Sequence, residues 1–135
     1  MNTRHGDRRK KSYRFRSSIG LATLPADRFV ALAPDDDSRP GLLQTKPFSF
    51  EGKELIINAE VPKDGLQVEL LDAKGNVLPG FGRKHCRLVK HGPLRHRVAW
   101  EPEGNTKSIG DRRHKTVALR FHLKRGDLYA FQIIK

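Results

Sequence analysis

Short runs in which every second residue is apolar recur along most of the chain. The clearest covers residues 116–124, where the alternating apolar positions are Val117, Leu119, Phe121 and Leu123. Successive side chains of a β-strand point to opposite faces, so this period predicts a strand with one face in a core. Residues 95–100 repeat the period, with His96, Val98 and Trp100 on one face and Arg95, Arg97 and Ala99 on the other. After a turn at 125–127, we expect Tyr129, Phe131 and Ile133 to line a single face.

Further strands are predicted from the same kind of pattern, with prolines, glycines and acidic residues between them. They fall at residues 18–24, 27–33, 42–50, 54–61, 66–72 and 77–82. No long segment repeats apolar residues at helical spacing, so any helix is short, and residues 106–114 have room for one turn. The pattern therefore predicts an all-β fold: an antiparallel two-sheet β-sandwich, jelly-roll-like, with about eight or nine short strands.

The chain of 135 residues is long enough for one modest core, so we expect a single β-sandwich domain over residues 17–135. Residues 1–16 have almost no apolar content and predict a basic, flexible N-terminal arm. No apolar run reaches the roughly 18 residues that a transmembrane helix needs. Because Pro25 and Asp27 interrupt the stretch after the basic start, no signal peptide is predicted, and the expected location is cytoplasmic by default.

Charge is distributed unevenly along the chain. Lys and Arg outnumber Asp and Glu by 27 to 15, which gives a formal charge of +12. Residues 1–16 hold seven basic residues against one acidic residue, residues 17–80 hold six against ten, and residues 81–135 hold fourteen against four. Excess positive charge favours association with polyanions and does not determine the fold. We therefore expect a polyanion as partner, and no membrane.

The sequence lacks the residues that most catalytic and metal-binding sites need. Zinc sites need clustered Cys and His, whereas one Cys and six scattered His are present, and His91 and His96 are interpreted as surface residues. His85 and Cys86 would point to opposite faces of a strand, so Cys86 is interpreted as a small buried side chain rather than a nucleophile. The acids at 35–37 lack apolar walls and are interpreted as a solvated loop, at best weak for calcium.

Two further motifs carry little weight. The glycines of residues 80–85 stand near cations, but the spacing and the following helix of a phosphate-binding loop are missing. The Arg-Gly-Asp stretch at 125–127 is interpreted as the hairpin turn between the last two strands. The sequence thus predicts no catalytic residue, no metal and no cofactor, and we do not expect an enzyme.

Cations occupy the predicted outward faces of two strands. If these strands belong to one sheet, the cations form a continuous basic patch with residues 111–115 at its rim, and such a patch would bind phosphate or sulfate. The candidate anion-binding or glycan-binding residues are Arg95, Arg97, Arg112, Arg113, Arg120, His122 and Lys124. Binders of single-stranded nucleic acid also need exposed aromatic residues, but Trp100, Phe121 and Phe131 are expected in the core. Tyr13 is the one aromatic residue expected to be exposed.

Five stretches taken together resemble a known family. They are SSIGLATLPADRFVALAP, GLLQTKPFSFEGKELIINAEV, VELLDAKGNVLPGF, RHRVAW and VALRFHLKRGDLYAFQI, which follow one another over residues 17–134. The sequence is similar there to the C-terminal region of large proteins related to glycoside hydrolase families 32 and 43. In those proteins a five-bladed β-propeller carries the catalysis and a β-sandwich follows it.

The resemblance implies an accessory module without the catalytic propeller, so no catalytic residue is carried over to this chain. We expect a non-catalytic module, structural or in contact with an acidic or neutral glycan, whose longer relatives contain the propeller as a partner. If a neighbouring propeller strand is missing, Ile19, Leu21 and Leu24 should be exposed. The alternative, favoured by the basic stretches, is a polyanion-binding or nucleic-acid-binding module that uses the N-terminal arm and the C-terminal basic face. The sequence does not indicate an oligomeric state.

Overall fold

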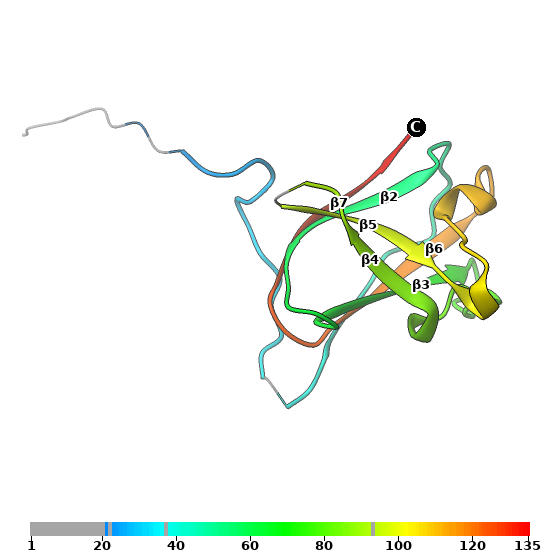
Figure 1. Ribbon diagram of the computed structural model, residues 1–135, viewed down its shortest axis with the longest axis horizontal. Helices are drawn as coiled ribbons and strands as arrows, with labels where there is room; N and C mark the ends of the chain where they lie inside the picture. Colours follow the sequence, from blue (N-terminus) through cyan, green and yellow to red (C-terminus); the bar gives the residue numbers. More distant parts are fainter. Residues whose placement is uncertain (1–20, 22, 37, 93) are drawn as a thin grey trace, which may run out of the picture.

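Two antiparallel sheets packed face to face form the body of the protein (Figure 1). The computed structural model describes residues 21, 23–36, 38–92 and 94–135, so the predicted arm at 1–16 lies outside the described residues. One sheet has the strand order β1-β6-β3 and the other the order β4-β5-β2-β7. The strands are β1 (Gly41–Gln44), β2 (Glu54–Glu60), β3 (Leu66–Asp72), β4 (Cys86–Lys90), β5 (Arg95–Trp100), β6 (Val117–Leu123) and β7 (Asp127–Ile134). The predicted antiparallel β-sandwich is therefore confirmed.

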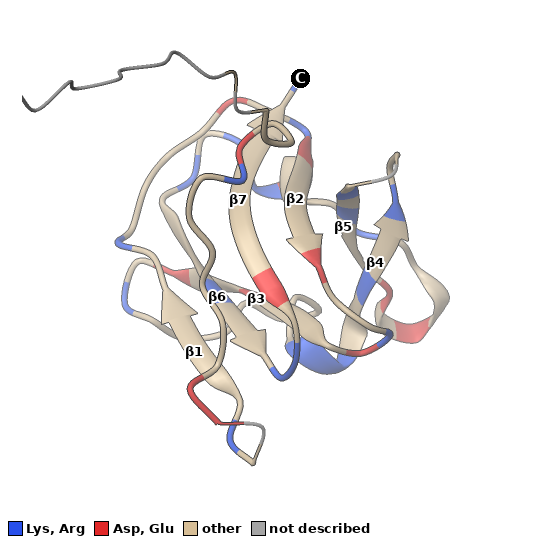
Figure 2. Cartoon of the chain, turned by 90° about the vertical axis from the view of Figure 1, so that its left-hand side faces the viewer, with Lys and Arg blue, Asp and Glu red and all other residues tan. Residues whose placement is uncertain are grey.

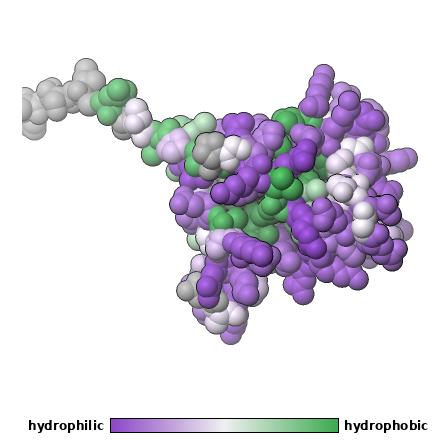
Figure 3. Space-filling view, in the orientation of Figure 1, coloured by the Kyte–Doolittle hydropathy of each residue, from purple (hydrophilic) through white to green (hydrophobic). Residues whose placement is uncertain are grey.

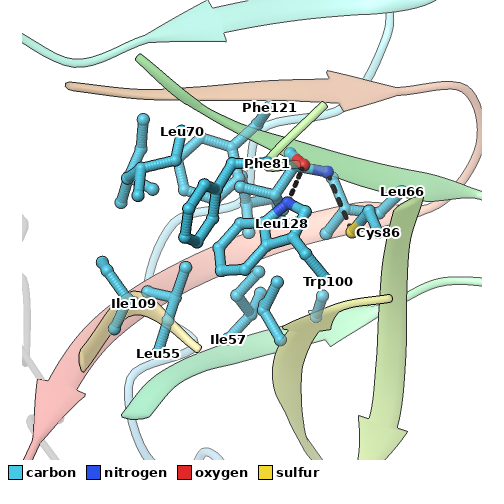
Figure 4. Packing of buried hydrophobic residues seen from close by; sticks show 14 of the residues in the cluster. Leu55, Ile57, Leu66, Leu70, Phe81, Cys86, Trp100, Ile109, Phe121 and Leu128 are labelled. Carbon is cyan, nitrogen blue, oxygen red and sulfur yellow. Dashed lines mark hydrogen bonds between the residues drawn. The ribbon is translucent and has the colours of Figure 1, made fainter. Parts of the chain in front are cut away.

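The core lies between the sheets and is filled by the alternating apolar positions of the strands. Trp100 is fully buried there, and the centroids of its ring and the Phe81 ring are 5.2 Å apart. Its indole Nε1 donates a hydrogen bond of 2.9 Å to the carbonyl of Val68 (Figure 4). A buried indole needs such an acceptor, because an unpaired N–H away from water costs about 1–3 kcal/mol. Trp100 and Phe121 are thus core residues, as expected. Phe131 was also expected in the core, but it lies on the edge strand β7 and is 38% exposed, with its ring centroid 5.4 Å from that of Phe121.

The described part of the chain has seven strands rather than eight or nine. Of the described residues in the strands expected at 18–24 and 27–33, only Leu32 pairs, through an isolated bridge to Leu128. Residues 77–82 do not form a full strand either, but Leu78 donates a backbone hydrogen bond to Leu70, which lies on β3. Seven strands are one fewer than the eight of a jelly roll, so a two-sheet sandwich is the description that the structure supports.

Strand β7 contains an irregularity that changes which side chains share a face. Ala130 pairs with Asn58 and Leu128 with Ala59, so Tyr129 is an extra residue, a β-bulge. As a result Leu128 joins the core, while the ring of Tyr129 lies under the guanidinium of Arg28 at 4.2 Å. The prediction that Tyr129 shares one face with Phe131 and Ile133 is therefore wrong, because a strict period of two fails at a bulge.

Short connections complete the fold. The three helical segments are 3₁₀ turns, η1 (Arg83–His85), η2 (Pro102–Gly104) and η3 (Ile109–Arg112), and η3 confirms the single turn expected within 106–114. Ser108 caps η3 together with Asp111. Among the described residues there is no helix long and apolar enough to cross a membrane. Gly126 has a positive φ of 91° in the turn between β6 and β7. These two strands belong to different sheets, so the Arg-Gly-Asp stretch is a turn that links the sheets, and the prediction of a hairpin turn is wrong.

Candidate functional site

The predicted basic patch is divided between the two sheets. Arg95 and Arg97 belong to β5 in the four-stranded sheet, whereas Arg120 and His122 belong to β6 in the three-stranded sheet. The outer faces of a sandwich point away from each other, so these side chains cannot line one surface. The prediction of a single patch is therefore wrong, because only the pairing of strands decides which sheet each strand joins.

On the outer face of the four-stranded sheet, the two arginines lie beside acids. Arg97 Nη1 donates to Glu54 Oε1 at 3.1 Å, and Arg95 Nη2 lies 3.9 Å from Asp27 Oδ2. The positive charge of β5 is in this way balanced within the fold. Figure 2 shows acidic positions at both ends of β2, the strand that pairs with β5.

On the outer face of the three-stranded sheet, Arg120 and His122 surround a buried carboxylate. Glu69 accepts a hydrogen bond of 2.8 Å from His122 Nε2 and lies 3.4 Å from Arg120 Nη1. Burial raises the pKa of Glu69, but the hydrogen bonds from His122 and the Arg83 amide, with the nearby charges, outweigh it, so its pKa is lowered overall. Arg120 also donates to Gln44 at 2.9 Å. Both cations are thus occupied within the sheet.

The remaining predicted residues lie elsewhere. The Arg112 guanidinium is 5.5 Å from the ring of Phe81, and Arg113 is exposed beside it after η3. The glycine-containing stretch at 80–85 already binds a carboxylate of the protein, because the Arg83 amide donates a hydrogen bond of 3.4 Å to Glu69 Oε1. The last predicted residue, Lys124, lies at the opposite end of β6 from the η3 segment.

Cys86 is buried, which agrees with its interpretation as a core side chain. Its Sγ accepts a hydrogen bond of 3.2 Å from the amide of Val68 (Figure 4). Burial raises the pKa of the thiol to about 11, which keeps it protonated and a poor nucleophile near neutral pH. No cluster of three or more His, Cys, Asp or Glu suited to a metal is found within the described ranges.

A concave site opens where the free edges of the two sheets meet. The cleft lies between β3 and β4, measures about 630 Å³, and is called here the β3–β4 cleft. Its lining residues are Val61, Pro62, Lys63, Asp64, Leu66, Gln67, Cys86, Arg87, Leu88, Lys90 and His96. Apolar side chains thus form part of its wall, and basic groups outnumber the single carboxylate.

Strand pairing brings two of the basic groups in the β3–β4 cleft together. Lys90 on β4 and His96 on β5 are direct partners in the antiparallel register, where opposed Cβ atoms lie about 4.5–5.5 Å apart. His96 follows the inward-facing period of Val98 and Trp100, so this pair lies where the core opens to solvent. Its Nε2 donates to the carbonyl of Ala59 at 3.2 Å, so in this tautomer Nδ1 can accept a hydrogen bond from a ligand hydroxyl. The pair thus places the ammonium group of Lys90 beside a hydrogen-bonding imidazole in the lining of the cleft.

Arg87 has hydrogen-bond and ion-pair partners within the protein, in contrast to Lys63 and Lys90. Arg87 donates to the carbonyl of Cys86 at 3.0 Å and lies 3.5 Å from Glu101. In the part of the chain that the structure describes, neither Lys63 nor Lys90 forms an ion pair. Both lysines are exposed at the cleft and are available to an anion.

A second depression adjoins the β3–β4 cleft and measures about 280 Å³. Its lining residues are Pro62, Lys63, Asp64, Gly65, Lys124 and Arg125. The first three also line the β3–β4 cleft, so the turn between β2 and β3 separates the two hollows. Of the residues predicted from sequence, Lys124 is the one that lines either hollow.

Sequence reasoning missed Lys63, Arg87 and Lys90 as site residues. It interpreted His96 as a surface residue, which is wrong, because His96 is half-buried on β5. The spacing of these residues has no motif, since they come from a turn and two strands. One signal was available: His96 stands at an inward position of a strand that otherwise carries Val98 and Trp100. A titratable group at the end of a core face marks the place where the core meets solvent.

In comparisons with known proteins, no family model matches the chain, and neither a curated protein nor a solved structure matches it significantly. The fold and the geometry of the cleft are therefore what bears on function. The resemblance to the C-terminal sandwich of glycoside hydrolase-like proteins stays a prediction.

Proposed function

We propose that this protein is a non-catalytic β-sandwich module that binds an acidic carbohydrate in the β3–β4 cleft. The observation that carries the proposal is the convergence of Lys63, Lys90 and His96 on one concave site with apolar side chains in its wall. Sulfate and carboxylate groups of an acidic glycan would form ion pairs with the ammonium groups of Lys63 and Lys90. The CH faces of its sugar rings would lie on the half-buried Leu88.

The absence of paired acids in the cleft supports a role in binding rather than catalysis. Asp64 is the one carboxylate of its lining, whereas glycoside hydrolysis ordinarily uses two carboxyl groups on either side of the bond. The resemblance adds that such a module accompanies a catalytic propeller in longer relatives. Exposed Leu21 and Leu24 agree with a missing neighbour of this kind, while Ile19 lies outside the described residues.

A nucleic acid is the second candidate ligand and is less well supported. The lining of the β3–β4 cleft contains no Phe, Tyr or Trp on which a base could stack. The cations of the two outer faces point apart and mostly lie beside acids, which removes the continuous basic surface that a duplex needs. The charge of the chain still favours weak association with any polyanion.

The test is a titration of the purified protein with a sulfated oligosaccharide, its unsulfated parent and single-stranded DNA, at low and at physiological salt. We expect saturable binding of the sulfated oligosaccharide that persists at physiological salt, and about fivefold to tenfold weaker binding by Lys63→Ala or Lys90→Ala. Arg97→Ala, which removes an equal charge from the outer face, should bind normally. Equal loss in all three variants, or tighter binding of DNA, would reject the cleft as a carbohydrate site.

A further inference from the structure

From the two adjoining hollows we infer that the ligand is a linear chain with several anionic groups, which crosses the turn between β2 and β3. One part of the chain lies in the β3–β4 cleft and the next part in the second depression. This inference rests on the proposed function and extends it, because it specifies a polymeric sulfated or uronate-rich glycan rather than a single acidic sugar.

The first support is that the two hollows share one wall. Pro62, Lys63 and Asp64 line both, so a ligand leaving one hollow over this turn enters the other directly. Lys63 is exposed at the crest and is in reach of anionic groups on either side. A compact ligand would fill one hollow only, whereas an extended one contacts both.

The second support is that basic side chains stand at both ends of this path. Lys90 and His96 form the pair at the cleft end, and Lys124 and Arg125 lie beyond the turn. In each hollow Asp64 is the only acidic residue of the lining. Repeated anionic groups spaced along one chain match cations that are spaced in this manner, and a single anion does not.

The third support is that the two turns are held together by backbone hydrogen bonds. The Gly65 carbonyl accepts from the amides of Lys124 at 2.7 Å and Arg125 at 3.2 Å, and the Gly65 amide donates to the Pro62 carbonyl at 2.9 Å. The basic side chains therefore project from a fixed frame. Binding to a preformed frame costs less ordering than binding to mobile loops.

The absence of aromatic residues in the two linings argues against a single-stranded nucleic acid along the path. Neither lining contains Phe, Tyr or Trp, so bases of a single-stranded nucleic acid would find no stacking platform. Gln67 in the cleft, which donates from its side-chain amide to the Arg83 carbonyl at 3.4 Å, still has an oxygen that can accept from a sugar hydroxyl. Hydroxyl and anion recognition are both provided.

The experiment measures affinity for sulfated oligosaccharides of increasing length, with the same sulfation per sugar. We expect affinity to rise by about tenfold or more once the chain is long enough to contact both hollows, and then to level off. In the Lys124→Ala/Arg125→Ala double variant that rise should disappear, while the shortest binding oligosaccharide keeps its affinity. The backbone amides that bond to Gly65 are retained in this variant, so its fold should persist.

The matched control is Arg113→Ala/Lys115→Ala, which removes the same charge from exposed positions near the start of β6. The control should show the full length dependence. A flat length series with intact binding of the shortest oligosaccharide would overturn the inference and leave the proposed function standing. An equal loss in both double variants would also overturn it, because the gain would then reflect net charge, and failure of every oligosaccharide to bind would reject the proposed function itself.

Discussion

The cations on the strand faces and the cations at the strand ends are used differently in this molecule. On the outer faces, Arg97 lies beside Glu54, and Arg120 and His122 surround Glu69. At the end of the sandwich, Lys63 and Lys90 project from a turn and the tip of a hairpin, without an ion pair among the described residues. Net charge alone therefore does not identify a binding surface, because cations with acidic neighbours are already occupied.

The difference between the paired cations of the outer faces and the cations of the cleft can be tested by substitution. The largest effect on stability is expected from Glu69→Ala. The change leaves Arg120 and His122 half-buried beside each other without a carboxylate, so the free energy of unfolding should fall by about 2–3 kcal/mol. Urea unfolding followed by Trp100 fluorescence measures it, with Lys90→Ala as the control that should stay within about 0.5 kcal/mol of the parent. A stable Glu69→Ala protein would mean that the cations on this face are as free as those of the cleft.

A smaller effect is expected from pH at the same carboxylate. The pKa of Glu69 in the folded protein is below its ordinary value of 4.5, so its ionised form stabilises the fold above that pH. This contribution should be lost progressively as the pH falls below about 4.5 and through the folded-state pKa. Thermal unfolding from pH 7 to pH 3 should therefore show a shallower decline in Glu69→Gln than in the parent. Parallel curves would assign the acid sensitivity to other groups.

The smallest effect is expected from Arg97→Ala on the outer face. Its ion pair with Glu54 is largely exposed, and such pairs contribute about 0.2–1 kcal/mol. Chemical unfolding should show a loss within that range that becomes smaller at high salt. A loss well above 1 kcal/mol would show that the outer faces depend on this ion pair as strongly as on Glu69.

The N-terminal segment shows where the prediction of strands failed. Residues 27–33 alternate in a manner typical of a strand, yet Phe29 and Val30 are exposed and, within this stretch, only Leu32 makes a bridge. Figure 3 shows hydrophobic atoms at the surface of the N-terminal segment that follows the grey residues. Instead, Arg28 attaches the segment to the four-stranded sheet, donating to Asn58 Oδ1 at 3.1 Å and to Glu60 Oε2 at 2.8 Å. A strand forms where a partner strand is available, and local alternation cannot report on the partner.

The alternation of apolar and polar residues was sufficient to predict a strand where one face was apolar and the other polar. β6 has four apolar residues on its inward face, with Arg120 and His122 between them, and it forms as predicted. It is the central strand of its sheet. The cleft could not be found in this way, because its residues are separated in sequence and meet only through the pairing of β4 with β5 and the turn after β2. Lys124 was found because it continues the β6 pattern, although the partners proposed for it were wrong.

By itself the sequence determined the class of fold, the inward residues of the regular strands and the excess of positive charge. These properties are local, since they depend on the period of two, on turn residues and on counting. Only the tertiary structure decided which sheet each strand joined, which cations gained an acidic neighbour and where the sandwich opened into a cleft. These properties are non-local, because each depends on contacts between residues that are distant along the chain.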